Sequence, residues 1–395
     1  MSLRSALRGL FFSSGSLTMR PAPPQSASSG SVLVGMYAFM LLPPVISSAG
    51  IWGYGFLTGT RSKGSSKEYN LSNTLWRLPA DNRVKGRPMI TVFGSLNVDY
   101  VFQMDRLPQP GQTLLASDLT VLPGGKGGNQ ALAAAKAGAG VCMVGAVGRD
   151  GLGDIALAGL SANGVDTSRV TQLELPTGTA SISVDAAGEN NIVVFPGANH
   201  GVSHVPLESC GFDDTTILLL QFEIPSPAME RAIDLAKRSG TRVIWNLAPM
   251  QPVSLGVLKS VDCLLVNEGE LGELCEELGL VRAGEKNLSH NDRIQAVAEL
   301  TGQSVVVTLG AAGCAAFYQN RLIEVTALPI TPIDTVGAGD AFAGAFAAAL
   351  DQNQRFEDAL KWGNVAGALA CLQPGAQSSL PTHAQILQHL PGLAS

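Results

Sequence analysis

Residues 334–344 read Asp-Thr-Val-Gly-Ala-Gly-Asp-Ala-Phe-Ala-Gly, a turn of small residues followed at once by a helix-forming run. The turn is Gly337-Ala338-Gly339, Asp340 falls in the first helical turn, and 341–350 continues the helix. The free N–H groups and the positive dipole end at such a helix start attract an anion. A carboxylate beside an anion site is explained if Asp340 takes a proton from an attacking hydroxyl while the amides stabilise a phosphoryl group in transfer. The alternative is that Asp340 is an ordinary N-cap residue after a glycine-rich turn.

A second glycine-rich loop, 123–130, reads Pro-Gly-Gly-Lys-Gly-Gly-Asn-Gln and opens another Ala-rich helix. It is not a Walker loop, because Lys126 is followed by Gly rather than by Ser or Thr and the glycine spacing differs. Its glycines let the backbone approach a small ligand, and Asn129 offers both a hydrogen-bond donor and an acceptor. The loop therefore indicates a site for a small polar ligand.

A polar pair follows the first predicted strand, 90–94. Asn97 and Asp99 lie two residues apart, so in an extended chain their side chains face the same side. Together with Asn129 they form a polar cluster suited to the hydroxyl groups of a sugar. The alternative for each residue, taken singly, is an ordinary turn residue.

Strands and helices alternate through the second half of the chain, which predicts a mostly parallel sheet covered by helices on both faces. The predicted strands are 90–94, 141–147, 180–185, 191–196, 216–221, 242–246, 262–266, 304–309, 314–318 and 321–325. The predicted helices are 128–137, 153–163, 227–239, 270–278, 291–301, 340–351, 356–371 and 382–389. The pair 180–185 and 191–196, joined around Gly188, lies outside this alternation and predicts a separate peripheral β-sheet.

Composition agrees with a large α/β protein that does not bind nucleic acid. Residues after 86 are enough for one large unit with a small appended piece, and 46% hydrophobic content with 45 glycines indicates a buried sheet with many tight turns. The net charge of −6 provides no basic surface for a nucleic acid. The six cysteines have no paired metal-ligand spacing, so we interpret them as reduced, mostly buried thiols of a non-oxidising compartment.

The first 86 residues differ from the rest of the chain. Asp and Glu are absent before Glu68, while Arg4, Arg8, Arg20 and many serines are present, a composition typical of an organellar transit peptide for a plastid or a mitochondrion. The apolar stretch 32–57 is long enough to span a bilayer, but Pro43-Pro44 interrupts it. A bipartite targeting leader, a membrane anchor and a mis-assigned gene start all remain open, and without targeting the protein is expected in the cytoplasm.

The two glycine-rich signatures together resemble the PfkB carbohydrate-kinase family, and within it the ribokinases. Intermediate landmarks match in the same order: 94–99, 197–199, 221–225, 246–249, 267–270 and 308–310. The resemblance runs from about 88 to about 390 and implies one kinase domain, 87–395, preceded by a poorly ordered extension, 1–86. It implies the three-layer ribokinase-like α/β fold, with a small β-sheet lid from about 97–122 and 178–199 that also forms a homodimer contact.

The resemblance implies an ATP-dependent ribokinase of D-ribose catabolism, which phosphorylates the 5-hydroxyl of D-ribose with Asp340 as general base. Gly337, Ala338 and Gly339 would then form the anion hole. The residues implied to hold the sugar are Asn97, Asp99, Gly125, Lys126, Asn129, Glu223 and Asp340. For Glu223 the alternative is a solvated loop carboxylate.

The resemblance also implies a nucleotide site and two kinds of cation. ATP would contact Asn267, Thr308, Gly310, Gly339 and Asn364, and Glu270 would organise Mg²⁺ through water. The alternative for Glu270 is a first-turn carboxylate favoured by the helix dipole. A K⁺ activator would be held by Asp334, Val336, Ala370, Gln373, Gly375 and Ser379. Two departures from the family pattern are Gln373-Pro374, where Pro374 restricts the backbone, and Gly-Gly at 127–128, where many relatives have Gly-Ala.

Three other functions remain. One is another PfkB-family kinase acting on a different sugar or on a nucleoside, and another is a non-catalytic member of the family, which the intact Asp340 and glycine turn disfavour. The third is a dinucleotide site at Gly151-Leu-Gly153, but that stretch lacks the full fingerprint.

Overall fold

A nine-stranded sheet forms the centre of the protein in the computed structural model, which describes residues 90–210, 212, 214–281 and 288–392. Its order is β13-β12-β11-β10-β9-β8-β1-β4-β5. Neighbouring strands from β11 to β5 are parallel, and β12 and β13 are antiparallel additions at one edge. The strands are β1 Ile90–Phe93, β4 Val141–Gly148, β5 Asp166–Leu173, β8 Ile217–Leu220, β9 Arg242–Asn246, β10 Cys263–Asn267, β11 Ser304–Thr308, β12 Cys314–Tyr318 and β13 Arg321–Val325.

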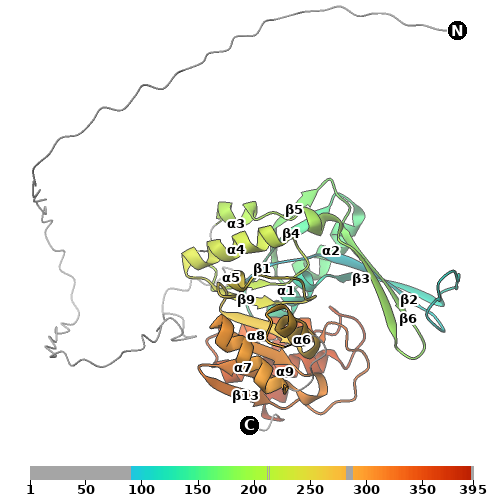
Figure 1. Ribbon diagram of the computed structural model, residues 1–395. Helices are drawn as coiled ribbons and strands as arrows, with labels where there is room; N and C mark the ends of the chain where they lie inside the picture. The colour runs from blue at the N-terminus through green and yellow to red at the C-terminus, as the bar shows by residue number, and fades with distance from the viewer. Residues whose placement is uncertain (1–89, 211, 213, 282–287, 393–395) are drawn as a thin grey trace, which may run out of the picture. The chain divides into compact units, whose positions relative to one another are not determined.

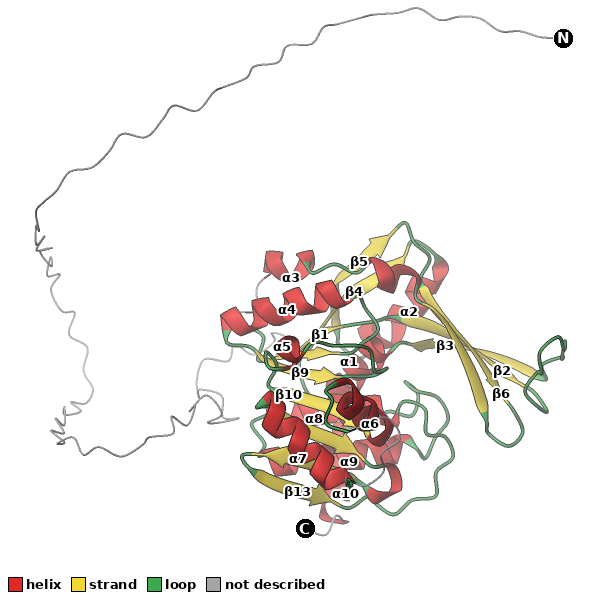
Figure 2. Ribbon diagram, viewed as in Figure 1, coloured by secondary structure: helices red, strands yellow, loops and turns green. Residues whose placement is uncertain are grey.

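Helices cover both faces of this sheet, because its central strands are apolar on both sides. Along β1, Ile90 and Val92 pack into one core, and Phe93 packs into the other. The first core holds α1 Lys126–Lys136, α2 Gly151–Ala162, α8 Ala338–Asp351, α9 Phe356–Ala370 and α10 His383–His389. The second holds α3 Val205–Cys210, α4 Ser226–Ser239, α5 Leu255–Leu258, α6 Glu268–Glu277 and α7 His290–Thr301. Figure 2 shows the strands running through the middle of this unit with the helices around them, which confirms the three-layer architecture.

A second, four-stranded sheet projects from the large one (Figure 1). Its order is β3-β2-β6-β7, built from β2 Asn97–Gln103, β3 Asp118–Gly124, β6 Gly178–Val184 and β7 Asn190–Phe195. All six residues of β7 are exposed, although four of them are Ile, Val, Val and Phe. We call this sheet the lid; its hairpin β6–β7 confirms the peripheral sheet expected around Gly188.

Short 3₁₀ turns complete the backbone at Gly197–Gly201, Gly310–Ala312 and Leu390–Gly392. The strands and helices expected from sequence are present with small shifts at their ends. Three strands and two short helices were not among the elements expected from the sequence pattern: β2, β3, β5, α3 and α5. Asn97 and Asp99 therefore lie inside β2, which belongs to the lid, and not in a turn after β1.

The expectations about the N-terminal extension, including the apolar stretch 32–57, lie outside the described residues. Within the described part of the chain, every helix is too short or too polar to cross a membrane.

Candidate active site

The first turn of α8 carries Asp340 and a group of free backbone amides. Gly337 precedes the helix with φ +79°, a left-handed conformation that suits glycine. The first intrahelical bond runs from the Ala341 N–H to the Gly337 carbonyl at 2.8 Å. Among the described residues no acceptor is present for the N–H groups of Gly337, Gly339 and Asp340, whereas Ala338 donates to the Thr335 carbonyl at 3.3 Å. The amides free for the expected anion site are thus those of Gly337, Gly339 and Asp340, whereas Ala338, which was also expected there, has its N–H engaged.

The Asp340 carboxylate is buried, with 6% of the residue exposed, and each oxygen accepts one hydrogen bond from α1. Asn129 Nδ2 donates to Oδ2 and Gln130 Nε2 donates to Oδ1, both at 2.9 Å. The donor of Asn129 that was expected to hold a sugar hydroxyl is therefore directed at Asp340. Its Oδ1 is buried without a hydrogen-bond partner among the described residues, so one polar atom of Asn129 is left for a ligand.

Asn97 is held in place by Asn199, a residue that is 1% exposed. Asn199 Nδ2 donates to Asn97 Oδ1 at 2.7 Å and to the Leu96 carbonyl at 3.0 Å, and Asn199 Oδ1 accepts from the Leu96 N–H at 2.8 Å. The remaining Asn97 group is its Nδ2 donor. The Asn199 side chain thus fixes which end of Asn97 is offered to a ligand.

Glu223 joins the ends of two loops beneath the lid. Its Oε2 accepts from Ser95 Oγ at 2.5 Å and from the backbone N–H of Lys126 at 2.9 Å. The side chain is partly buried, so it is not a solvated loop carboxylate. One carboxylate oxygen, Oε1, has no partner among the described residues and is left for a ligand.

Four carboxylates and one ammonium group influence one another across this region. Burial, followed by the negative charges of Glu223 and Asp340, raises the pKa of Asp99 to about 7. The charge of Asp340, with smaller contributions from Glu223 and Glu270, raises the pKa of Lys126 against the opposing effect of burial. Burial raises the pKa of Glu270. The region therefore favours a cation at Lys126 and penalises ionisation of Asp99.

A cavity of about 220 Å³ lies directly at Asp340. Besides Asp340 it is lined by residues from both glycine-rich loops and from the ends of the sheet strands: Lys126, Asn246, Ala248, Leu265, Val266, Asn267, Glu270, Thr308, Thr335, Gly337 and Gly339. Seven of the twelve lining residues are ones that sequence analysis assigned to the site. The cavity is small, polar and close to a buried carboxylate, which suits the reacting end of a ligand.

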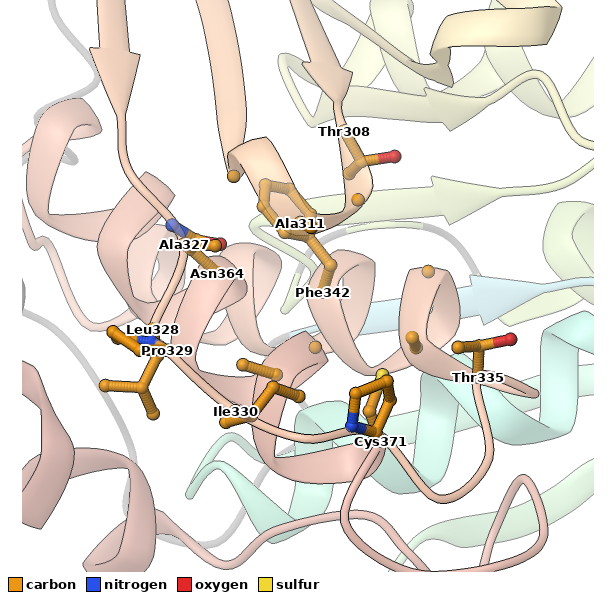
Figure 3. Close-up of a pocket in the computed structure, with 17 residues that line it drawn as sticks. Thr308, Ala311, Ala327, Leu328, Pro329, Ile330, Thr335, Phe342, Asn364 and Cys371 are labelled. Atoms are coloured by element: carbon orange, nitrogen blue, oxygen red, sulfur yellow. The ribbon is translucent and has the colours of Figure 1, made fainter.

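A larger and more apolar cavity of about 530 Å³ adjoins the first and shares Thr308, Thr335 and Gly339 with it. Figure 3 shows its labelled side chains, with Phe342 and Ala311 on one side and Leu328 and Pro329 on another. The expected nucleotide residues Thr308, Gly310, Gly339 and Asn364 all line it. An apolar pocket that opens onto a row of free helix amides suits an aromatic base with an attached phosphate chain.

Asn364 forms part of this cavity without presenting its donor to it. The residue is 6% exposed, and its Nδ2 donates to the carbonyls of Val325 and Thr326 at 3.3 and 2.7 Å. Asn364 therefore anchors the segment after β13 that forms one wall of the pocket.

Asn267 and Glu270 form a capping box at the start of α6. Asn267 Oδ1 accepts from the Glu270 N–H, and Glu270 Oε2 accepts from the Asn267 N–H, both at 2.8 Å. Glu270 is therefore a first-turn carboxylate that caps α6, as the alternative interpretation expected. Both side chains nevertheless line the smaller cavity, and the second Glu270 oxygen has no partner among the described residues. A partly buried carboxylate oxygen beside a phosphate site fits a hydrated Mg²⁺.

The residues expected to bind a monovalent cation are joined through Asp334. Its Oδ1 accepts from the Val336 N–H at 2.9 Å, and its Oδ2 accepts from the Gly375 N–H at 2.8 Å. The carbonyls of Val336 and Gln373 meet no hydrogen-bond donor in the described part of the chain. Free carbonyl oxygens beside a carboxylate fit a cation. The Pro374 carbonyl accepts from Ser378 Oγ at 2.7 Å.

Sequence analysis did not assign several residues that organise the site. Gln130, Gln221, Asn246 and Asn199 are all buried and all belong to hydrogen-bond networks around Asp340 or Asn97. Each lies within a sequence stretch that matches the family pattern, and this position was the one feature of the sequence that could have identified it as a site residue. Their partners lie far away in sequence and could not be deduced from it.

The family model of the pfkB family of carbohydrate kinases matches residues 87–383. The ribokinase of Haemophilus influenzae is 33% identical over 312 residues, which cover 77% of this chain and 99% of that protein. The deoxyribokinase of Salmonella typhi is 30% identical over 309 residues, covering 76% of this chain and 98% of that protein. The structure of Arabidopsis thaliana ribokinase complexed with ribose and ATP is 32% identical, with a TM-score of 0.69, and the match covers 77% of this chain and 99% of that one.

Proposed function

We propose that this chain transfers the γ-phosphoryl group of ATP to the 5-hydroxyl of D-ribose. The chain belongs to the pfkB family of carbohydrate kinases and is therefore a phosphotransferase acting on a sugar hydroxyl. One observation carries the proposal: the buried carboxylate of Asp340 lines the small polar cavity, which shares Thr308, Thr335 and Gly339 with the larger apolar one. Of the residues proposed to hold the sugar, Lys126 and Asp340 line the small cavity. The reacting hydroxyl of a sugar and the phosphate end of a nucleotide would meet at this carboxylate.

The chemistry follows from that position. Asp340 accepts the proton of the sugar hydroxyl, the hydroxyl oxygen bonds to the γ-phosphorus, and the bond from that phosphorus to the ADP oxygen breaks. The amides of Gly339 and Asp340 donate to the oxygens of the phosphoryl group in transfer. A positioned general base contributes roughly 10² to 10⁴ in rate, and the loss of one oriented donor costs roughly 10² to 10³.

Lys126 and the lid hold the sugar in this proposal. Asn97 offers its Nδ2 donor, and Asp99 and Glu223 offer carboxylate oxygens, an arrangement that matches adjacent hydroxyl groups. Gly125 lets the sugar approach the backbone of the same loop. Support for ribose comes from the ribokinase relatives, whereas the match to a deoxyribokinase makes 2-deoxyribose the second candidate.

Two cations assist in this proposal. Mg²⁺ supplies charge neutralisation on the nucleotide phosphates when it is bound. Glu270, with Asn267, would hold its water ligands, and Asp334, Val336, Ala370, Gln373, Gly375 and Ser379 would hold K⁺ beside the free amides. The free carbonyls of Val336 and Gln373 support the second site.

The lid is also the proposed homodimer contact. Leu119, Val121, Ile192, Val193, Val194 and Phe195 on its strands are between 40% and 66% exposed. Exposed apolar surface of this extent at a sheet edge favours contact with a partner sheet, because the contact removes the apolar side chains from water. Residues 1–86 remain a proposed targeting extension, which a fusion to a fluorescent reporter would test.

Two measurements test the function. The full chain, supplied with ATP and Mg²⁺, should phosphorylate D-ribose with a higher kcat/KM than 2-deoxyribose, fructose or adenosine, and a different order would overturn the substrate. Asp340→Asn should lower kcat by roughly 10² to 10⁴ while ribose binding by calorimetry persists. The matched variant Asp358→Asn removes a surface carboxylate paired with Arg355 and should leave kcat unchanged. Near-normal turnover of Asp340→Asn would refute its role as the base.

A further inference from the structure

A chain of buried side-chain amides lies beneath Asp340. Gln130 and Gln221 are both 0% exposed. Gln130 Nε2 donates to Asp340 Oδ1 and to Asn246 Oδ1, both at 2.9 Å, and Gln130 Oε1 accepts from Gln221 Nε2 at 2.7 Å. The chain therefore links α1, β9 and the end of β8 to the first turn of α8.

The direction of these hydrogen bonds is fixed by chemistry. An ionised carboxylate only accepts, so the nitrogen of Gln130 must face Asp340, and its oxygen must then face Gln221. Gln130 uses both of its amide hydrogens and its oxygen, so a rotated amide would lose all three bonds. The side chain has one arrangement in which its polar atoms are satisfied.

The backbone leaves room for this arrangement at Gly94. A Cβ atom at that position would lie 1.9 Å from Gln221 Oε1, so any side chain there would displace Gln221. Gly94, directly after β1, thus makes space for the amide chain.

Gln130 differs from its neighbour Asn129, although both donate to Asp340. Asn129 lies in the loop proposed to bind sugar and has an unpaired oxygen, so a ligand can draw it away. Gln130 is fully buried and does not line either cavity. Its bond to Asp340 can therefore persist while substrates enter and products leave.

We propose that Gln130, held by Gln221, is a positioning residue that fixes the plane of the Asp340 carboxylate for proton transfer. The inference rests on the proposed role of Asp340 as general base. It assigns a function to Gln130 that does not depend on which sugar is the substrate. Because Gln130 holds Oδ1, the Asp340 carboxylate keeps its orientation toward the attacking hydroxyl even when a ligand draws Asn129 away from Oδ2.

The test replaces Gln130 with Met, which has a similar length and cannot donate. Because a misplacement of about 1 Å at a reacting group costs roughly 10²-fold in rate, Q130M should lower kcat by about 10- to 100-fold. The KM values for sugar and ATP should stay within about threefold, since Gln130 touches neither. Q221M should also lower kcat, but by a smaller factor, because Gln221 acts on Asp340 only through Gln130. If Q130M does not fold, Q221M tests the proposal in its place.

Gln352→Met is the matched control. Gln352 also joins α8 to α1, through its Nε2 bond to the Ala137 carbonyl at 3.1 Å, but at the far ends of both helices. It should lower the melting temperature less than Q130M does, because it removes one hydrogen bond rather than three, and it should leave kcat unchanged. A loss of kcat in Q352M equal to that in Q130M would show that general loosening of the helix pair explains the effect.

A double-mutant cycle separates positioning from structural support. In an Asp340→Asn background Q130M should cause little further loss of kcat, because its partner no longer acts as a base. Equal losses in both backgrounds, an unchanged kcat in Q130M, or a rise in KM alone would overturn the proposal. All rates are measured with the sugar that the parent protein turns over fastest, so a wrong assignment of ribose leaves this test valid. If Asp340→Asn is as active as the parent, the proposed function fails instead.

Discussion

Replacing Asp99 with Asn should make the protein more stable at pH 8 than its parent while weakening its affinity for sugar. Asp99 lies in β2 of the lid, and its carboxylate packs against the backbone of Gly124, where a Cβ atom would lie 2.1 Å from Oδ2. Burial and the charges of Glu223 and Asp340 raise its pKa from 3.8 to about 7. Ionisation of this carboxylate, which is proposed to bind sugar, therefore lowers the stability of the fold.

The size of the effect follows from this shift. A pKa raised from 3.8 to about 7 corresponds to at most about 4 kcal/mol of unfavourable free energy in the ionised folded state. Solvent reaches part of the side chain, so about 1–2 kcal/mol is expected. Between pH 4 and 7 the folded protein keeps a proton that the unfolded chain has lost. The contribution of Asp99 to the unfolding free energy therefore decreases as the pH rises through that window, and is lowest above pH 7.

Urea unfolding of the full chain at pH 5 and pH 8 measures this directly. The difference in unfolding free energy between Asp99→Asn and the parent should be about 1–2 kcal/mol larger at pH 8 than at pH 5. Taking the difference cancels the titration of all other groups. Asp118→Asn, at an exposed position of the same lid, is the control and should show no such change.

A Glu223→Gln background refines the test, because it removes one of the two neighbouring charges that raise the pKa of Asp99. In that background, the increase in unfolding free energy that Asp99→Asn produces at pH 8 relative to pH 5 should be smaller. A gain that is equal at both pH values, or one that is larger at pH 5, would refute the electrostatic reasoning.

Three further predictions concern the parts around the site. Asn199→Ala removes three buried hydrogen bonds and should lower the unfolding free energy by about 2–4 kcal/mol and raise the KM for sugar; an unchanged KM would show that Asn97 needs no support. Asn364→Ala frees the carbonyls of Val325 and Thr326, which precede the segment that forms one wall of the larger cavity. It should raise the KM for ATP roughly tenfold, or about 1.4 kcal/mol, and leave the KM for sugar unchanged; equal effects on both would contradict the assignment of that cavity to the nucleotide. Val193→Asp places a charge on the exposed face of β7 and should convert a dimer into a monomer in light scattering, whereas an unchanged mass would place the contact elsewhere.

The large sheet could be predicted from sequence because its central strands are short apolar runs between turn signals. Segments such as 217–220, with four consecutive aliphatic residues, allow no other interpretation than burial on both faces. The segment 166–173 reads Asp-Thr-Ser-Arg-Val-Thr-Gln-Leu and forms an edge strand without an apolar pattern, so it was missed. Strand β2 was also absent from the strands expected from the sequence pattern, because its polar residues at 97 and 99 resemble a turn, and the family resemblance alone placed 97–122 in the lid.

The sequence predicted the chemical groups of the candidate site better than it predicted the hydrogen bonds among them. Glycine-rich loops and the residues beside them indicated which side chains to expect near a ligand. The bonds among those side chains depend on which strands become neighbours, and Gln130 and Asp340 are 210 positions apart. For this reason the sequence assigned Asn129 to the sugar alone, although the structure shows its donor bound to Asp340.

The positions of the two carboxylates imply that binding and catalysis can be altered separately. Asp340 is tied by hydrogen bonds to α1 and lies on a helix packed into the main core, whereas Asp99 lies in the lid. The two interact through charge, since Asp340 contributes to the raised pKa of Asp99. Binding that favours the ionised form of Asp99 must overcome this repulsion, so sugar affinity should rise with pH up to about pH 7. The repulsion is absent when Asp340 becomes Asn. In that variant the pH dependence of sugar affinity should therefore shift to lower pH, and a profile identical to that of the parent would show that the two carboxylates do not share one site.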